Sequence, residues 1–246
     1  MPKTLILIPS RMSAERLPGK PLLEINNLAI ISHVYKSAIK ANIGEVVVAT
    51  PDIEILEEVE KNGGKAVITS TQHKTGTDRI FECFQKLKIF DVEYIINLQG
   101  DEPGINPDDI VNLNNFMILN KSDIGTLAAE IKDSQIFFNA NVVKVITKEK
   151  LNNNNFPIAL NFIRKHLSEN NQNIYHHIGM YAYKTKVLEK FVNFNQTKNE
   201  IKNRLEQLRA LDYNIKINVA LAKSSPIGVD TKEDYLAIKK IMEYKL

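Results

Sequence analysis

Short apolar runs alternate with amphipathic segments through the first hundred residues, and this alternation constrains the fold more than any other feature. Strands that are apolar on both faces, separated by helices, predict an α/β fold with a mainly parallel sheet and helices on both faces. Ligands of such sheets bind beyond the carboxyl ends of the strands. The expected strands are 4–9, 45–50, 65–69 and 93–99, and the expected helices are 29–42, 52–64 and 76–87.

The second half of the chain is less regular. Its apolar runs predict strands, its amphipathic runs predict helices, and the Asn-rich stretch 151–173 fits neither pattern. A length of 246 residues suits one domain, 1–246, with a subdomain inside it. The expected strands here are 124–131, 141–147, 174–185 and 213–222, and the expected helices are 199–212 and 231–246.

Composition excludes several classes of protein. The net charge is only +3 and no long Lys/Arg block is present, which argues against a nucleic-acid-binding surface. No apolar run approaches the length of a membrane span, and nothing resembles a signal peptide. The single cysteine, Cys83, rules out an internal disulfide framework and is expected to pack in the core. These features predict a soluble, cytoplasmic protein.

The first strand runs directly into a charged, turn-rich loop, 10–22. Pro9 is expected to stop strand pairing, because proline has no N–H to donate. The cations Arg11, Arg16 and Lys20 follow, together with a tight turn, which favours a polyanion site. A solvated basic loop explains the same residues equally well. The loop has neither the Walker A spacing nor the G-x-G-x-x-G fingerprint that would identify a known phosphate-binding motif.

Three further loops carry polar patterns at expected strand or helix ends. In 73–80, Thr75 or Thr77 suits a helix N-cap, while the helix N-terminus and Arg79 also suit an anionic ligand. Asp101 lies at the end of the strand 93–99, where a carboxylate suits Mg²⁺ bridged to phosphates, although a simple turn is the alternative. Asp230 is expected to cap the last helix.

Taken in order, these segments and three later ones resemble the 3-deoxy-manno-octulosonate cytidylyltransferase (CMP-Kdo synthetase) family over nearly the whole chain. The motifs RLPGKPL and LQGDEP occur in looser form in other sugar nucleotidyltransferases. The motifs HIGMYAY and LEQLR restrict the resemblance to the branch that uses Kdo. The motifs are IPSR…RLPGKPL (8–22), TGTDR (75–79), LQGDEP (98–103), HIGMYAY (177–183), LEQLR (205–209) and GVDTKED (228–234).

The resemblance implies a Rossmann-like nucleotidyltransferase fold, a homodimer and a requirement for Mg²⁺. The implied reaction couples CTP with 3-deoxy-D-manno-octulosonate (Kdo) to give CMP-Kdo and pyrophosphate, for lipopolysaccharide biosynthesis. Sugar binding and dimerisation would involve roughly residues 130–212.

The family's site roles carry over residue by residue. Lys20, Asp101 and Asp230 would be catalytic, the two aspartates by holding Mg²⁺. Arg164 would meet the Kdo carboxylate, and a binding role for His177 is favoured over general-base catalysis. The implied nucleotide-binding residues are Arg11, Arg16, Lys20, Thr75, Gly76, Arg79 and Gln99, and the sugar-binding residues are Arg164, His177, Tyr181, Glu206 and Gln207.

The chain departs from the family pattern at two places. The segment after Arg164, 165–173, is shortened, and Ala14 replaces a serine that usually stands in the first loop. These changes leave alternatives open: a cytidylyltransferase for a related sugar acid, such as an amino-substituted Kdo, another sugar nucleotidyltransferase, or a non-catalytic nucleotide-binding relative.

Overall fold

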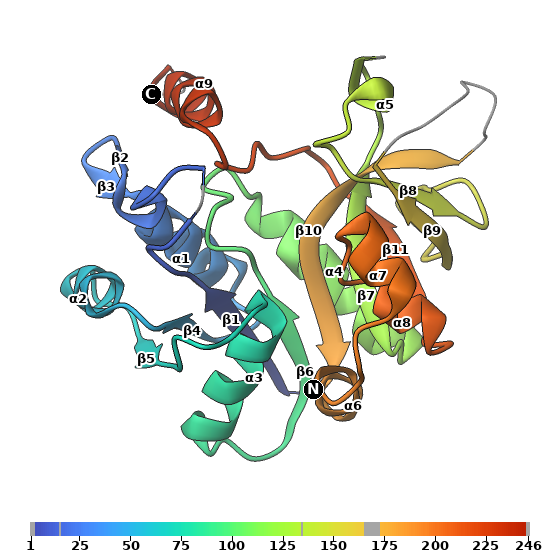
Figure 1. Ribbon diagram of the computed structural model, residues 1–246, viewed down its shortest axis with the longest axis horizontal. Helices are drawn as coiled ribbons and strands as arrows, with labels where there is room; N and C mark the ends of the chain where they lie inside the picture. The colour runs from blue at the N-terminus through green and yellow to red at the C-terminus, as the bar shows by residue number, and fades with distance from the viewer. Residues whose placement is uncertain (1–2, 15, 134, 165–172, 245–246) are drawn as a thin grey trace. The chain divides into compact units, whose positions relative to one another are not determined.

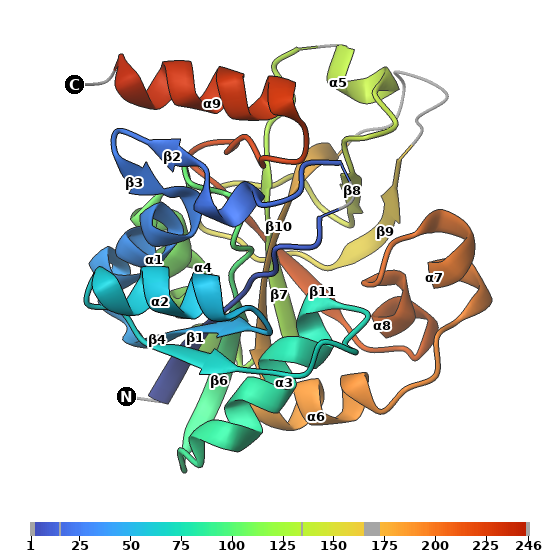
Figure 2. The same ribbon diagram turned by 60° about the vertical axis from the view of Figure 1, so that its left-hand side comes forward.

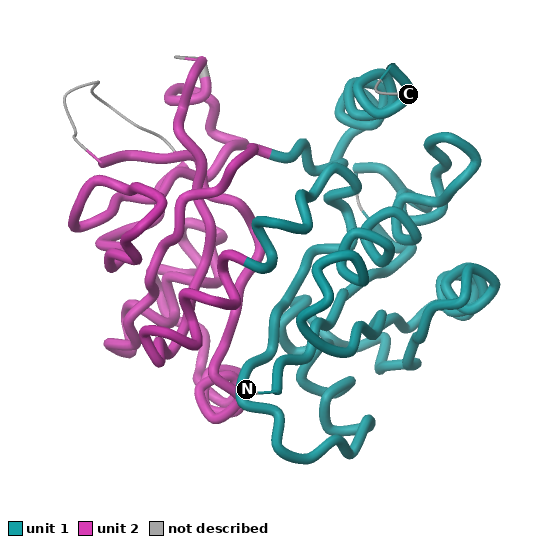
Figure 3. Tube along the Cα trace, turned by 180° about the vertical axis from the view of Figure 1, so that it is seen from behind, with its two compact units in different colours: residues 1–111, 226–246 teal, residues 112–225 magenta. Residues whose placement is uncertain are grey.

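The computed structural model describes residues 3–14, 16–133, 135–164 and 173–244. The chain forms two compact units, coloured separately in Figure 3. Unit 1 comprises residues 1–111 and 226–246, and unit 2 comprises residues 112–225. The boundary at residue 111 falls inside helix α4 (Pro107–Asn120), which the sequence pattern did not predict. Within the described ranges, no helix has both the length and the apolar character needed to cross a membrane.

Unit 1 contains the parallel sheet that the apolar runs predicted. Its strands run side by side in the order β6-β1-β4-β5, and each neighbouring pair is parallel. Leu5 to Ile8 and Val46 to Ala49 are almost fully buried, which explains why these strands are apolar on both faces. The strands are β1 (Lys3–Pro9), β4 (Gly44–Thr50), β5 (Ala66–Ile68) and β6 (Val92–Asn97).

Helices cover both faces of this sheet, as Figures 1 and 2 show. Helices α1 (Ile30–Ala41) and α2 (Ile53–Lys61) pack side by side on one face, and α3 (Gly76–Leu87) covers the other. The predicted core position of Cys83 is confirmed: burial raises the pKa of its thiol to about 12, so it stays protonated.

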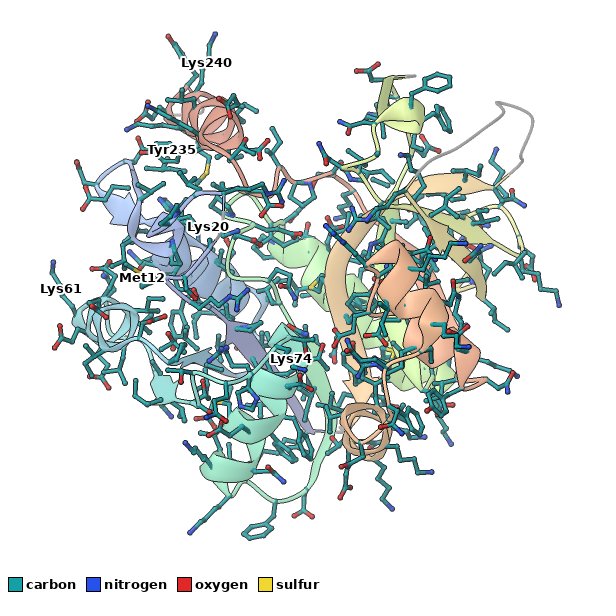
Figure 4. The ribbon with its side chains drawn as sticks, in the orientation of Figure 1. Met12, Lys20, Lys61, Lys74, Tyr235 and Lys240 are labelled. Atoms are coloured by element: carbon teal, nitrogen blue, oxygen red, sulfur yellow. The ribbon has the colours of Figure 1, made fainter. Side chains whose placement is uncertain are left out.

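The last helix, α9 (Lys232–Glu243), packs against the hairpin of β2 (Glu24–Ile25) and β3 (Leu28–Ala29). The Tyr235 hydroxyl, labelled in Figure 4, donates to the Glu24 carbonyl at 2.7 Å. Ile25, Ile30, Val229 and Ile238 form the buried cluster beneath the helix. This packing fixes the segment that precedes α9, which carries Asp230.

The expected N-cap role of Asp230 is wrong by one residue. Thr231 is the N-cap of α9, and its hydroxyl accepts from the Asp234 N–H at 3.2 Å. The Asp234 carboxylate reaches back to the Thr231 N–H at 2.9 Å, which completes a capping box. Because Thr231 caps the helix, the Asp230 carboxylate is available for other contacts.

Unit 2 is built on a mixed sheet. In the order β11-β7-β10, the first pair is parallel and the second antiparallel, while β8 pairs with β10 and with β9. The strands are β7 (Ile124–Ala129), β8 (Lys144–Thr147), β9 (Ala159–Ile163), β10 (Ile174–Lys184) and β11 (Ile217–Leu221), and the helices are α5 (Gln135–Phe138), α6 (Thr185–Val192), α7 (Lys198–Asn203) and α8 (Leu208–Asp212).

Two local predictions are corrected by the structure. The single helix expected over 199–212 is two helices, α7 and α8, because Arg204 adopts a left-handed conformation with φ of 52°. Pro9 does not stop pairing: it is the last residue of β1 and lies in register with Ala49. The Ser10 N–H donates to the Ala49 carbonyl at 3.0 Å, so the missing donor of Pro9 leaves the end of the ladder intact.

Candidate functional site

A cleft of about 420 Å³ lies in unit 1, where the loops after β1, β5 and β6 meet. All the residues that the resemblance assigned to the nucleotide and the metal line it. The cleft thus lies at the carboxyl ends of the strands, where the sequence predicted a ligand site. The lining residues are Pro9, Ser10, Arg11, Ala14, Arg16, Lys20, Pro21, His73, Lys74, Thr75, Gly76, Arg79, Gln99, Gly100, Asp101 and Asp230.

The first loop folds around Met12, which Figure 4 labels. The Met12 carbonyl accepts from the Gly19 N–H at 3.0 Å, and the Met12 N–H donates to Asp52 Oδ2 at 2.7 Å. Gly19 has a φ of 75°, a conformation that favours glycine. Asp52 lies at the start of α2 and was not identified from the sequence as part of the site. It fixes the shape of the loop that presents the cations.

Lys20 connects the two predicted metal ligands. Its ammonium donates to Asp101 Oδ2 at 2.6 Å, to Asp230 Oδ1 at 3.1 Å and to the Val229 carbonyl at 2.8 Å. Burial tends to lower the pKa of Lys20, but the two carboxylates outweigh it and raise the pKa above its ordinary value. Arg16 pairs with the other oxygen of Asp230 at 2.8 Å. The two carboxylates therefore converge on one cationic atom.

Backbone contacts hold these two aspartates close together. The Val229 N–H donates to the Asp101 carbonyl at 2.8 Å, which joins the loop after β6 to the segment before α9. A Cβ on Gly100 would lie 2.9 Å from the Pro9 carbonyl oxygen, so only glycine allows this approach. The glycine in LQGDEP is thus required by packing against the end of β1.

The N-terminus of α3 forms another wall of the cleft. Thr75, one of the two predicted candidates, is its N-cap, and its hydroxyl accepts from the Asp78 N–H at 3.1 Å. The Arg79 guanidinium is buried and donates to Thr69 Oγ1 at 2.7 Å and to the Ser70 carbonyl at 3.1 Å. Burial and the neighbouring Arg11 lower the pKa of Arg79. Arg79 therefore organises the loop after β5 as well as lining the cleft.

Three polar residues of the cleft were not identified from the sequence: Ser10, His73 and Lys74. Lys74 has no hydrogen-bond or ion-pair partner within the part of the chain that the structure describes. By contrast, the carboxylates Asp101 and Asp230 hold Lys20. The position of Lys74 directly before the TGTDR motif was the available signal.

The two carboxylates that surround the Lys20 ammonium form an arrangement that suits Mg²⁺. Mg²⁺ is commonly bound by one or two protein carboxylates, with water and substrate phosphates completing its shell. Asp101 and Asp230 supply hard oxygen ligands, and the Lys20 ammonium already occupies a position that both oxygens reach. The donor set therefore fits the metal that the resemblance implied.

His177, on β10 of unit 2, is buried and neutral. Burial and the neighbouring His176 lower the pKa of His177 to about 3. Its Nε2 lies 3.0 Å from Thr126 Oγ1, and that hydroxyl donates to the Met180 carbonyl at 2.8 Å. Because the hydroxyl has one proton to give, Nε2 carries the imidazole proton and Nδ1 is an acceptor. This arrangement suits binding a hydroxyl group.

The other predicted sugar-binding residues lie at two places, the break between α7 and α8 and strand β10. Glu206 and Gln207 fall within the break, and Tyr181 lies beside His177 with ring centroids 5.4 Å apart. The buried Tyr181 hydroxyl has no hydrogen-bond partner in the described ranges. Burial, Tyr183 and Glu206 raise its pKa well above the ordinary value.

Arg164 is engaged with the main chain. Its guanidinium donates to the carbonyls of Asn203 and Arg204 at 3.3 and 3.2 Å, and to that of Ala140 at 3.4 Å. It therefore supports the turn that carries Glu206 instead of projecting freely. Residues 165–172 of the segment that the sequence comparison identified as shortened lie outside the described part of the chain. Ala14 lines the cleft, where it presents a methyl group in place of a hydroxyl.

Comparisons with known proteins agree with this geometry. The cytidylyltransferase family model matches residues 5–217. The 3-deoxy-manno-octulosonate cytidylyltransferase of Rhodopseudomonas palustris (strain BisB5) is 43% identical over 99% of both chains, and that of Nitrobacter hamburgensis is 42% identical over 98% of this chain and 93% of its own.

The structural match is equally extensive. The solved structure of CMP:2-keto-3-deoxy-manno-octonic acid synthetase complexed with CTP superposes with a TM-score of 0.89 at 33% identity, covering 99% of this chain and all of the other. The predicted α/β nucleotidyltransferase fold is confirmed by this match. The chain therefore belongs to the cytidylyltransferase family, among the 3-deoxy-manno-octulosonate cytidylyltransferases.

Proposed function

We infer that the chain transfers CMP from CTP to the anomeric hydroxyl of Kdo, giving CMP-Kdo and pyrophosphate. The observation that carries this inference is the convergence of Asp101, Asp230 and Lys20 in a cleft lined by further cations. The relatives named for the same reaction support it, and so does the CTP complex of the solved neighbour. A cytoplasmic, homodimeric enzyme belongs to the same proposal.

The cations of unit 1 bind the triphosphate. Arg11 and Lys74 have no anionic partner in the described ranges, so both are available to phosphate oxygens. Lys20 and Arg16 are held by carboxylates until the triphosphate competes for them. Transfer to the α-phosphorus needs positioning and charge neutralisation more than a covalent intermediate. Thr75, Gly76, Arg79 and Gln99 line the same cleft and position the nucleotide.

Asp101 and Asp230 would hold Mg²⁺. When bound, the metal supplies charge neutralisation at the α-phosphate and lowers the pKa of the attacking hydroxyl. The two carboxylates hold the cation, and Lys20 stabilises negative charge on the departing pyrophosphate.

In unit 2, the proposed binding residues for the sugar acid are His177, Tyr181, Glu206 and Gln207. Arg164 contributes by supporting the turn that carries Glu206. The His177 Nδ1 accepts a hydrogen bond from a sugar hydroxyl, because its Nε2 proton is committed to Thr126. The low pKa of His177 keeps the imidazole uncharged at neutral pH. His177 therefore acts in binding and not as an acid.

A pyrophosphate-release assay tests the function directly. CTP, UTP, ATP and GTP are each supplied with Kdo and Mg²⁺, and CTP is then supplied with other sugar acids, including 8-amino-substituted Kdo. We expect release only with CTP, and fastest with Kdo. Faster turnover of the amino-substituted acid would assign the related activity instead. Tight CTP binding without turnover of any acid would indicate a non-catalytic relative.

Replacing Lys74 tests a cleft cation that has no anionic partner in the described ranges. We expect Lys74→Met to raise the KM for CTP about tenfold with little change in kcat, because a charge-assisted hydrogen bond contributes about 1.5–3 kcal/mol. Binding of CMP should weaken less than binding of CTP. Lys61→Met, which removes an exposed lysine of α2, is the matched control; Figure 4 labels both residues. An unchanged KM would remove Lys74 from the binding site.

A further inference from the structure

His73 is the titratable residue of the cleft that the assigned roles leave unused. It belongs to the loop between β5 and α3 and lines the same cleft as Arg11, Lys20 and Lys74. Its side chain is 23% exposed, so part of the ring remains open to a ligand. Its Nε2 is hydrogen-bonded to Glu82 on α3.

Glu82 is held firmly in its charged form. Its Oε2 accepts from the Ser70 N–H at 2.8 Å as well as from His73, and its Oε1 pairs with Lys86 at 2.7 Å. Burial tends to raise the pKa of Glu82, but the hydrogen bonds from Lys86, Ser70 and His73 outweigh it and lower the pKa to about 2. At neutral pH, Glu82 is therefore an acceptor only.

This network fixes the protonation of His73 at one nitrogen. Since the Glu82 carboxylate has no proton to donate, Nε2 of His73 carries a proton and donates it. Nδ1 is then the one polar atom of the ring left for a ligand, and it has no partner within the described part of the chain.

We propose that His73 is a further triphosphate-binding residue, positioned by Glu82, and that it takes up a proton when CTP binds. An ionised phosphate oxygen only accepts hydrogen bonds, so contact with Nδ1 requires a proton there. That proton comes from solvent, and the resulting imidazolium lies between the phosphate and Glu82. This proposal rests on the proposed function, because it requires CTP in this cleft.

The charges around His73 set the balance of this protonation. Glu82 favours the cationic ring, and the phosphates of a bound nucleotide add to that effect. The neighbouring cations act in the opposite sense, and binding brings in the phosphate charge that the added proton neutralises. The charged groups facing this region are Glu82, Lys86 and Arg79 on α3, Lys74 on the same loop, and Arg11 on the loop after β1.

Calorimetry of CTP binding tests the proposal without turnover. The full chain is titrated with CTP and Mg²⁺, in the absence of any sugar acid, in buffers that differ in ionisation enthalpy. We expect proton uptake on binding to the unaltered protein. His73→Gln should abolish the part of the uptake that belongs to the ring and weaken CTP binding about tenfold, because glutamine keeps a donor for Glu82 but no titrating nitrogen.

Glu82→Gln tests the positioning role. It should reduce proton uptake while His73 is still present, an effect that a purely structural role would not produce. The matched controls are His33→Gln and Glu45→Gln. His33 is a histidine of α1 that is hydrogen-bonded to the Ile25 carbonyl of β2, and Glu45 is a half-buried carboxylate paired with Lys65. Both controls should bind CTP with unchanged proton uptake.

The outcomes separate this proposal from the proposed function. If the unaltered protein does not bind CTP, the proposed function fails. If it binds CTP and His73→Gln shows the same affinity and the same proton uptake, His73 makes no contact with the triphosphate and only this proposal fails. Loss of affinity with unchanged proton uptake would reduce His73 to a neutral contact and would also overturn the proposal.

Discussion

Asp101→Asn should lower kcat for pyrophosphate release from CTP and Kdo by about a thousandfold. The substitution removes one of the two carboxylates that converge on the cation position, while the amide keeps the same shape. Charge neutralisation by a bound metal contributes several kcal/mol to phosphoryl transfer, and each 1.36 kcal/mol is a factor of ten in rate. Steady-state kinetics at saturating Mg²⁺ and CTP measure the effect.

The variant should remain folded, because the Asp101 carboxylate contributes no core packing. Lys20 keeps its contacts with Asp230 and the Val229 carbonyl, and the Asp101 main chain still accepts from the Val229 N–H. Asp91→Asn is the matched control: Asp91 is exposed, precedes β6, and has a φ of 64° that asparagine tolerates. Near-normal turnover of Asp101→Asn would refute the metal-binding role.

The fold of unit 1 and its cleft could be predicted because both leave local signals. A strand buried on both faces must be apolar throughout, as in Leu5 to Ile8, and a ligand crevice at strand ends concentrates charge there, as in Lys20 and Asp101. The cap of α3 was narrowed to Thr75 or Thr77 for the same reason, since capping depends on a few neighbouring residues.

Residues that act through distant contacts were not predictable in this way. Asp52 reaches a main-chain N–H 40 residues earlier in the chain, and its place at the start of α2 resembled an ordinary helix terminus. Glu82 was not singled out within the expected helix 76–87, although it organises the loop that carries His73. Such roles depend on which segments the tertiary fold brings together.

The break between α7 and α8 has a similar tertiary origin. The segment 199–212 has helical spacing throughout, and nothing at Arg204 signals a left-handed residue. The structure instead stabilises the break through Arg209, which reaches back across it to Glu200. The turn that results carries Glu206 and Gln207, so the predicted sugar-binding residues depend on this ion pair for their position.

Glu200→Gln should therefore be among the most destabilising single changes in unit 2. The side chains of Glu200 and Arg209 are only 5% and 4% exposed, and Arg209 Nε donates to Glu200 Oε2 at 2.8 Å. Removing the Glu200 charge takes away the two short contacts of the buried Arg209 guanidinium and leaves it the longer contact with Glu206 at 3.6 Å, at a cost of about 3 kcal/mol. Urea unfolding followed by circular dichroism should show a clearly lower midpoint.

The intact Glu200–Arg209 pair contributes less to the free energy of unfolding than is lost when one partner is removed. A variant that replaces both partners is therefore the control. Replacing both partners by apolar residues of similar volume, Glu200→Leu with Arg209→Met, should restore much of the lost stability, because no buried charge remains. Glu45→Gln, which changes a half-buried carboxylate paired with the exposed Lys65, should leave the midpoint nearly unchanged. If the double variant unfolds as easily as Glu200→Gln, the lost stability comes mainly from the geometry of the break and not from an uncompensated charge. In that case the KM for Kdo should rise equally in both variants.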